Sequence, residues 1–223
     1  MSVPRFKLIA EVDARAMTPG STVELEAGGH VTPLARDTLR ERRITVVPAG
    51  SVDADLPADL APAADVRRVA IGSDHTGVAL KAALVAHLRK AGRAVADLGT
   101  LGSEPVDYPD IAAAVGRSVV RGEADAGIVI DGAGLGSAIA ANKIRGVRAA
   151  MCQTPTLARY AREHNGANVL ALGATLLTVP EAIEIVETWL GTATREPRYL
   201  RRLLKVRRLE SSFDKAPGDK DVL

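Results

Sequence analysis

The chain has 223 residues, 47% hydrophobic and 25% charged, which is the balance of a globular protein and excludes disorder throughout. Its 29 Lys and Arg oppose 27 Asp and Glu, and a net charge of +2 gives no reason to expect a nucleic-acid or membrane-surface partner. No apolar run is long enough for a signal peptide or a membrane helix, so we expect a cytoplasmic protein. The single cysteine, Cys152, excludes an internal disulfide and a zinc site built on several thiolates.

The first 48 residues predict a small α+β extension. FKLIAEV and STVELE are strand candidates, and Thr32 can cap a helix that begins at Pro33 and ends near Arg43, followed by a strand over Ile44–Val47. Residues 49–66 are mostly Ala, Asp and Pro without a sustained apolar period, which indicates a linker.

Residues 67–210 predict an α/β domain, with a tail over 211–223. Five apolar runs alternate with helical stretches that begin near Gly77, Pro109, Gly136, Thr154 and Pro180; the runs are RVAIGS, AVADLG, AGIVID, VRAAMC and VLALGA. Such alternation is typical of a parallel sheet with helices on both faces, here a three-layer, Rossmann-like fold with five strands. In these folds ligands bind at the carboxyl ends of the strands.

Two titratable groups follow the first strand of this domain. Asp74 and His75 stand immediately before a helix, where they could bind a ligand or transfer protons. The alternative is that Asp74 only caps the helix and that His75 is a solvated turn residue.

A glycine-rich loop follows the third strand. Asp131 is followed by Gly132, Gly134, Gly136 and Ser137, and such a loop lets backbone N–H groups converge on an anion at a helix amino terminus. The spacing argues against NAD, because Ser137 stands where the third glycine of G-x-G-x-x-G belongs, and the P-loop ending is absent. A pocket of amides with one carboxylate remains.

Towards the carboxyl terminus, His164 lies near a predicted helix end, where alone it is best interpreted as a cation that compensates the helix dipole. Arg198 and Arg202 stand at i, i+4, so one helix face could present both to one phosphate. The other basic residues nearby are expected to be solvated.

Six motifs in order connect these segments to a known family. They are IGSDHTG, LGT with VDYPD, the glycine loop running into IAANK, VRAA, REHNGANVLALGA, and Arg198-x-x-x-Arg202. Over about residues 68–209 the chain resembles the ribose-5-phosphate isomerase B family, which includes the galactose-6-phosphate isomerase subunits. The resemblance implies an aldose–ketose isomerase without metal or cofactor, a homodimer or higher homo-oligomer whose active sites form at the subunit interface.

The resemblance also implies residue roles. Asp74 and His75 would hold the sugar phosphate, Tyr108 would line the pocket, and Asn142 would hydrogen-bond near the glycine loop. The remaining roles fall on residues late in the chain: His164 and Asn165 for ring opening, Arg198 and Arg202 for the phosphate.

The chain departs from the family at the proton-transfer base. Many members have cysteine at the position of Asp131, and others have a glutamate at that of Ser137; Ala133 replaces a common threonine and Tyr199 a usual histidine. Our hypothesis is that Asp131 moves the proton between C2 and C1 while amides near Gly132–Gly136 hold the enediolate. A purely structural role for Asp131 stays open.

Ribose 5-phosphate and ribulose 5-phosphate are the expected substrates. A six-carbon or deoxy sugar phosphate is the second interpretation, because Ala133 and Tyr199 alter the pocket wall. A non-catalytic sugar-phosphate-binding or scaffold protein is the third. A nucleotide-dependent redox protein is a fourth, which the loop spacing argues against.

The extension has a resemblance of its own. HVTPLARDTLRERRITVV resembles a segment near the termini of some enzymes associated with bacterial microcompartments, where it serves attachment or packing. This implies a shell or cargo contact and a location inside such a compartment. The alternative is a subdomain that covers an edge of the dimer. Cys152 is expected to be a small buried residue.

Overall fold

The computed structural model describes residues 3–49, 60–62, 65–194 and 196–212. The chain divides into two compact units, Met1–Ala58 and Asp59–Leu223. Residues 50–59 and 63–64 of the predicted linker, and 213–223 of the predicted tail, lie outside the described residues. Within the described ranges, no helix is both long and apolar enough to cross a membrane.

The amino-terminal unit alternates strands and helices: β1 (Arg5–Ile9), α1 (Glu11–Ala16), β2 (Thr22–Val31), α2 (Pro33–Glu41) and β3 (Thr45–Pro48). Its strands pair in parallel in the order β1-β2-β3, so this unit is α/β and not the α+β extension that we predicted. The predicted strand FKLIAEV is wrong in its second half, because the Asp13 carboxylate accepts the Ala10 N–H at 2.8 Å and starts α1. Thr32 caps α2 as predicted, accepting the N–H of Ala35.

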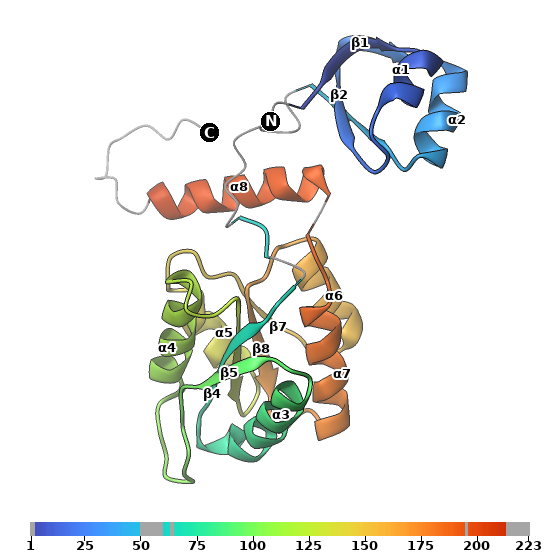
Figure 1. Cartoon of the computed structure of the whole chain (residues 1–223). Helices are drawn as coiled ribbons and strands as arrows, with labels where there is room; N and C mark the ends of the chain where they lie inside the picture. Colours follow the sequence, from blue (N-terminus) through green and yellow to red (C-terminus); the bar gives the residue numbers. More distant parts are fainter. Residues whose placement is uncertain (1–2, 50–59, 63–64, 195, 213–223) are drawn as a thin grey trace. The chain divides into compact units, whose positions relative to one another are not determined.

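The second unit contains a parallel sheet in the order β5-β4-β6-β8-β7, which confirms the predicted five-stranded fold (Figure 1). The strands are β4 (Arg68–Ser73), β5 (Ala94–Asp97), β6 (Ala126–Asp131), β7 (Ala149–Met151) and β8 (Val169–Gly173). The helical elements are η1 (His75–Gly77), α3 (Val78–Lys90), α4 (Tyr108–Val120), α5 (Leu135–Ala141), α6 (Pro155–Glu163), α7 (Val179–Leu190) and α8 (Pro197–Ser212).

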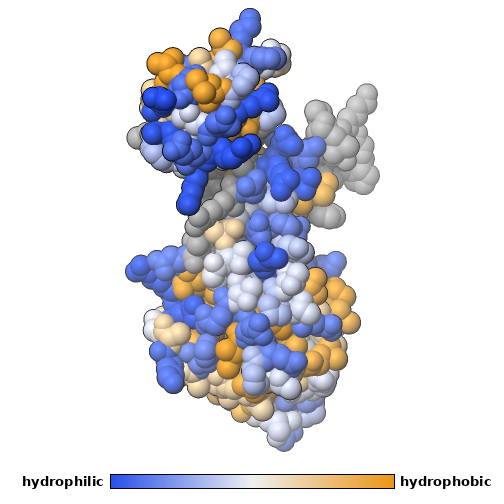
Figure 2. Space-filling model, turned by 90° about the vertical axis from the view of Figure 1, so that its right-hand side faces the viewer, coloured by the Kyte–Doolittle hydropathy of each residue, from blue (hydrophilic) through white to orange (hydrophobic). Residues whose placement is uncertain are grey.

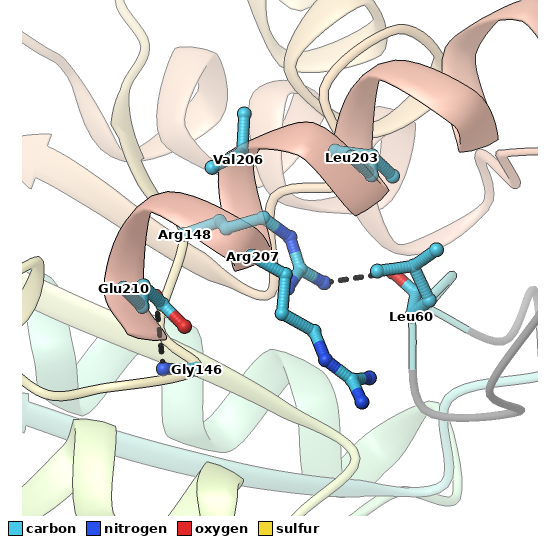
Figure 3. A pocket seen from close by; sticks show the side chains of 7 residues that line it. All are labelled: Leu60, Gly146, Arg148, Leu203, Val206, Arg207 and Glu210. Carbon is cyan, nitrogen blue, oxygen red and sulfur yellow. Dashed lines mark hydrogen bonds between the residues drawn. The ribbon is translucent and has the colours of Figure 1, made fainter. Parts of the chain in front are cut away.

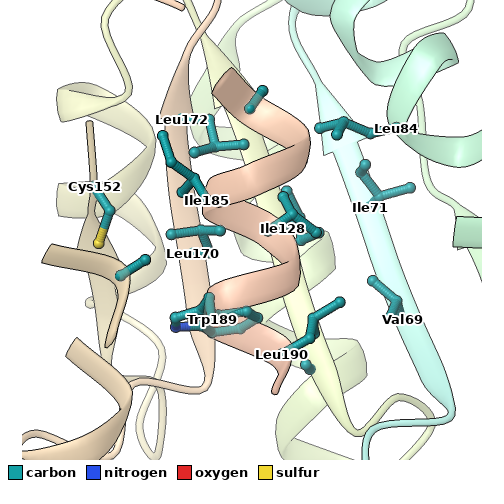
Figure 4. Packing of buried hydrophobic residues seen from close by; sticks show 14 of the residues in the cluster. Val69, Ile71, Leu84, Ile128, Cys152, Leu170, Leu172, Ile185, Trp189 and Leu190 are labelled. Carbon is teal, nitrogen blue, oxygen red and sulfur yellow. The ribbon is translucent and has the colours of Figure 1, made fainter. Parts of the chain in front are cut away.

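Alternate residues of each strand enter two separate cores. On one face, Ile71 of β4 and Ile128 of β6 pack with residues of α3, α6 and α7, including Trp189 (Figure 4). On the other face, Ala70 and Val129 pack with residues of α4 and α5. Because successive strand side chains point to opposite faces, the continuous apolar runs of the sequence build a three-layer domain.

Helix α8 lies across the end of the sheet at which the strands begin (Figure 1). Leu203 of α8 is 3% exposed and packs so closely on Gly166 that a Cβ built there would lie 2.6 Å from its side chain. Near the other end of α8, the Glu210 carboxylate accepts the N–H of Gly146 at 3.1 Å. The helix is therefore fixed to the sheet unit at two places.

A small cavity of about 50 Å³ lies under α8 (Figure 3); its lining residues are Leu60, Gly146, Arg148, Leu203, Val206, Arg207 and Glu210. Leu60 belongs to the predicted linker but is 2% exposed. Its carbonyl accepts a hydrogen bond from Arg148 Nη2 at 3.0 Å. The described end of that linker thus packs as part of the second unit.

Candidate functional site

The carboxylate of Asp131 organises the loop that follows β6. Its Oδ1 accepts the N–H groups of Ala133, at 2.8 Å, and of Gly134, and its Oδ2 accepts the N–H of Ser137 at 2.7 Å. Gly134 has φ of 77°, and a Cβ built there would lie 2.8 Å from the carbonyl carbon of Leu172, so glycine is required. Asp131, 6% exposed, therefore fills the amide nest that we expected to hold a ligand anion.

These bonds correct part of the predicted site. The amides of Gly134 and Ser137 are already used by Asp131, and Ser137 is 2% exposed, so neither amide is free for substrate. A carboxylate has about four lone-pair positions, three of which are occupied here, so one on Oδ2 stays open. Three loop amides have no acceptor in the described part of the chain: those of Gly132, Leu135 and Gly136.

Asp74 follows β4 and lies beside the end of β6, because its N–H donates to the carbonyl of Ile130 at 3.0 Å. Its Oδ1 accepts the N–H and hydroxyl of Thr76, at 2.9 and 2.5 Å, and the N–H of Gly77 at 3.3 Å. Asp74 thus caps η1, as the alternative interpretation from the sequence predicts. Its Oδ2 has no hydrogen-bond partner among the residues described. Thr76 also faces the glycine loop, 3.8 Å from a Cβ built on Gly132.

Tyr108 borders the same loop, and His75 contacts the segment just before Tyr108. Nδ1 of His75 is 3.4 Å from the N–H of Val106 and accepts from it, so the proton of a neutral ring is on Nε2. Tyr108 is 39% exposed, and its ring covers Gly136, where a Cβ would lie 2.6 Å from it. We call Asp74, His75, Tyr108, Asp131 and loop residues 132–137 the strand-end cluster.

His164 lies between two tyrosine rings. Its ring centroid is 4.7 Å from that of Tyr160, at an interplanar angle of 17°, and 4.4 Å from that of Tyr199, at 31°. Its Nε2 is 3.9 Å from a carboxylate oxygen of Glu163, and the side chain is 31% exposed. Both faces of the imidazole are therefore covered while an edge stays open.

Arg198 and Arg202 flank the same tyrosine. Their guanidinium carbons lie 4.7 and 5.7 Å from the Tyr199 ring centroid, and Arg198 Nη2 donates to the Tyr199 hydroxyl at 2.9 Å. Arg198 is also 3.9 Å from the Glu196 carboxylate, with its side chain 62% exposed. We call Tyr160, His164, Arg198, Tyr199 and Arg202 the stack cluster.

Within one chain, the two clusters lie at opposite ends of the strands: the strand-end cluster at the carboxyl ends and the stack cluster at the amino ends. Asp131 ends β6, whereas His164 precedes the start of β8 at Val169. Strands β6 and β8 pair in parallel, with Gly127 beside Val169 and Asp131 beside Gly173, so four residues separate the carboxyl ends of these strands from their amino ends. At roughly 3.3 Å per residue, that separation is about 13 Å. One chain alone does not bring Asp131 and His164 together.

The two predicted asparagines differ in their surroundings. Asn142 accepts the Ala149 N–H at 2.8 Å and donates to the carbonyls of Ala138 and Ala149, both at 2.9 Å. Its amide protons therefore fasten β7 to α5, and the expected hydrogen bond at the glycine loop is not formed. Asn165 donates to the carbonyl of Tyr160 at 3.2 Å, beside the stack cluster.

Cys152 is 1% exposed in the main core, and burial raises the pKa of its thiol to about 11. It is a packing residue, as predicted. No group of three or more His, Cys, Asp or Glu side chains in the described ranges is arranged to hold a metal ion.

Two features of the site were not predicted. Tyr160 stands four residues before His164, a helical spacing that brings side chains together, and this could have indicated the stack. The bonds from Asp131 to the amides two and three residues later are typical of an Asp-led turn, which a local analysis of Asp131-Gly132-Ala133 could have found.

Comparison with known proteins adds family relationships. A model of the Ribose/Galactose Isomerase family matches residues 69–206. The ribose-5-phosphate isomerase B of Escherichia coli (strain K12) is 42% identical over 145 residues, which cover 65% of this chain and 97% of that protein.

Solved structures agree. The ribose-5-phosphate isomerase B of Clostridium thermocellum matches with a TM-score of 0.65 at 46% identity, covering 66% of this chain and 99% of that one. The enzyme of Mycoplasma genitalium with bound ribulose-5-phosphate matches with a TM-score of 0.62 at 39% identity, covering 65% and 96%. The family match begins at residue 69 and so does not include the amino-terminal unit.

Proposed function

Because the chain belongs to the Ribose/Galactose Isomerase family, we propose that it is an aldose–ketose isomerase that interconverts ribose 5-phosphate and ribulose 5-phosphate. One observation carries this beyond family membership. Two buried carboxylates, Asp74 and Asp131, stand at the ends of adjacent strands, and each keeps a carboxylate position open. Acid–base chemistry on a sugar needs such groups at one edge.

The proton transfer is proposed to use the open lone pair on Oδ2 of Asp131. That oxygen takes the proton from C2 of the opened aldose, and the C1 carbonyl oxygen becomes the enediolate oxygen. The carbon-bound proton then returns to C1, while the proton of the C2 hydroxyl passes to the C1 oxygen, which leaves a hydroxyl on C1 and a ketone at C2. The amides left to stabilise the enediolate are those of Gly132, Leu135 and Gly136. The amides of Ala133, Gly134 and Ser137 are occupied by Asp131 and take no part in this step.

Ring opening and phosphate binding are proposed to come from a second copy of the chain. His164 would assist ring opening, and Arg198 and Arg202 would bind the phosphate. In one chain, however, these groups lie near the amino ends of the strands, whereas Asp131 lies at a carboxyl end. The exposed apolar side chains of Leu135 and Ile139 on α5, 57% and 64% exposed, border the glycine loop and offer a surface for that copy. Hydrophobic areas also interrupt the hydrophilic surface on the face drawn in Figure 2.

Proton exchange in deuterated water tests the reaction. Incubation with ribose 5-phosphate should place deuterium on the carbon next to the carbonyl, because the proton that Asp131 holds while the enediolate exists exchanges with solvent. Six-carbon and deoxy sugar phosphates belong in the same panel. If only one of these is labelled, the substrate assignment changes but the proposed isomerase reaction is kept. Absence of both label and conversion with every sugar phosphate would refute the isomerase and leave a binding protein.

The amino-terminal unit is proposed to attach the enzyme to a bacterial microcompartment. The support is the resemblance of the segment that contains α2 to segments of microcompartment enzymes. The apolar side chain of Leu34 in α2 is 62% exposed, so it can contact a partner. Co-sedimentation of the full chain with shell proteins, compared with a chain that starts at Asp59, tests this. Equal sedimentation of the two chains would favour a subdomain that covers the enzyme's own surface.

A further inference from the structure

Tyr199 touches every group of the stack cluster that has a proposed role. Its ring lies 4.4 Å from the His164 ring, and its hydroxyl accepts from Arg198 at 2.9 Å. The guanidinium carbon of Arg202 lies 5.7 Å from its centroid. Tyr199 itself is 8% exposed, so its own position is fixed by packing.

The stack restricts how the imidazole can move. With Tyr160 on one face and Tyr199 on the other, the His164 ring cannot tilt out of its plane without losing a contact. A catalytic imidazole needs a defined direction for its ring nitrogens, because proton transfer depends on alignment. Tyr199 covers one face of the imidazole and belongs to a different helix, α8.

The two arginines have the opposite difficulty, because they are exposed. A free arginine side chain has considerable rotamer entropy, part of which is lost when it holds a ligand. The hydroxyl and the ring of Tyr199 already hold Arg198 beside Arg202. An anion arriving there meets two cations that need less ordering.

The position of α8 makes this arrangement rigid. Leu203, one helical turn after Tyr199, packs on Gly166 of the loop that follows His164. At the far end of the helix, Glu210 holds Gly146 (Figure 3). Tyr199 is therefore presented by a helix that is fastened at two places after it.

We propose that Tyr199 is the positioning residue that couples the ring-opening histidine to the phosphate site, its ring orienting His164 and its hydroxyl orienting Arg198. This rests on the proposed function for its catalytic part and on anion binding for the rest. The hydroxyl and the ring have separate partners, so two substitutions at one position separate the two effects.

Tyr199→Phe keeps the ring and removes the hydroxyl. We expect the KM for ribose 5-phosphate and the dissociation constant of inorganic phosphate to rise about three- to tenfold, with kcat within about twofold. Tyr199→Leu removes the ring as well, and kcat should fall about tenfold or more, because the imidazole loses its alignment. Arg208→Gln, which removes a charge from the same helix away from Tyr199, is the matched control and should leave all three constants unchanged.

Two measurements need no turnover and so keep this inference distinct from the proposed function. Calorimetry measures phosphate binding directly, and proton NMR follows the His164 ring signals, which Tyr199→Leu should shift and Tyr199→Phe should not. If the wild type turns over no sugar phosphate, these two readouts still support or refute the coupling. Unchanged phosphate affinity in Tyr199→Phe, or unchanged His164 signals in Tyr199→Leu, would overturn it.

Discussion

Replacing Asp131 tests whether its carboxylate holds the glycine loop. In the folded chain it accepts the N–H groups of Ala133, Gly134 and Ser137, and the last of these lies in the first turn of α5. A hydrogen bond to a charged group contributes about 1.5–3 kcal/mol, and loss of a capping side chain costs about 0.5–2 kcal/mol. Because the three bonds share one acceptor group and are not additive, we expect Asp131→Ala to lower the free energy of unfolding by about 2–4 kcal/mol.

Asp131→Asn should have a smaller effect. Its remaining oxygen can still accept from the loop, but its amide group cannot accept the N–H of Ser137, so we expect a loss of about 1–2 kcal/mol. Urea unfolding followed by the fluorescence of Trp189 measures both variants, because this single tryptophan is fully buried in the second unit, which also contains Asp131. The exposed acid Glu184, replaced by Gln, is the control and should unfold within about 0.5 kcal/mol of wild type.

The outcome also separates capping from catalysis. If Asp131→Asn unfolds early but keeps wild-type turnover, the carboxylate is a cap and the proton-transfer base lies elsewhere. If both Asp131 variants unfold like the wild type, within about 0.5 kcal/mol, the argument from the loop hydrogen bonds is refuted.

Three further predictions concern stability. Gly134→Ala should cost about 2–3 kcal/mol in urea unfolding, because it combines a positive φ with a backbone contact at 2.8 Å, whereas Gly132→Ala, with 3.8 Å of clearance, should cost less than about 1 kcal/mol. Cys152 has its thiol pKa raised from 9.0 to about 11, so the unfolded chain ionises first and wild-type stability should fall between these pH values by up to about 3 kcal/mol. The same pH titration of Cys152→Ala should lack this fall, and parallel curves would contradict the assignment. A chain that starts at Asp59 should be more stable than one that starts at Asp65 by about 2 kcal/mol, because both keep the buried Val66 and only the first keeps the buried Leu60; equal midpoints would show that the Leu60 contact contributes nothing.

The fold of the second unit could be predicted because its signals are local and repeated. Apolar runs such as AGIVID, with all six residues buried, are typical of central parallel strands, and Thr154 before Pro155 marks a helix start. The amino-terminal unit was harder. Glu11 and Asp13 begin a helix after a strand of only five residues, and the apolar content of FKLIAEV alone does not reveal that change.

The candidate site was predictable in its residues and less so in its connections. The sequence places Asp74 and Asp131 at strand ends, and its Asp-led turn indicates the bonds to Ala133 and Gly134, but it does not reveal that Asp131 also accepts the N–H of Ser137, six residues later. Likewise the family motifs name His164, whereas its place between Tyr160 and Tyr199 depends on how α8 packs against α6. Such contacts depend on tertiary packing and have no local signature.

The separation of Asp131 from His164 has a genetic consequence. If each working centre takes the first residue from one subunit and the second from its neighbour, a protein with a defective aspartate and a protein with a defective histidine would complement each other. Co-expression of the two inactive forms would then regenerate one competent centre in every mixed pair. Selection would act on the pair of subunits, and extreme dilution would silence catalysis while every polypeptide stayed folded.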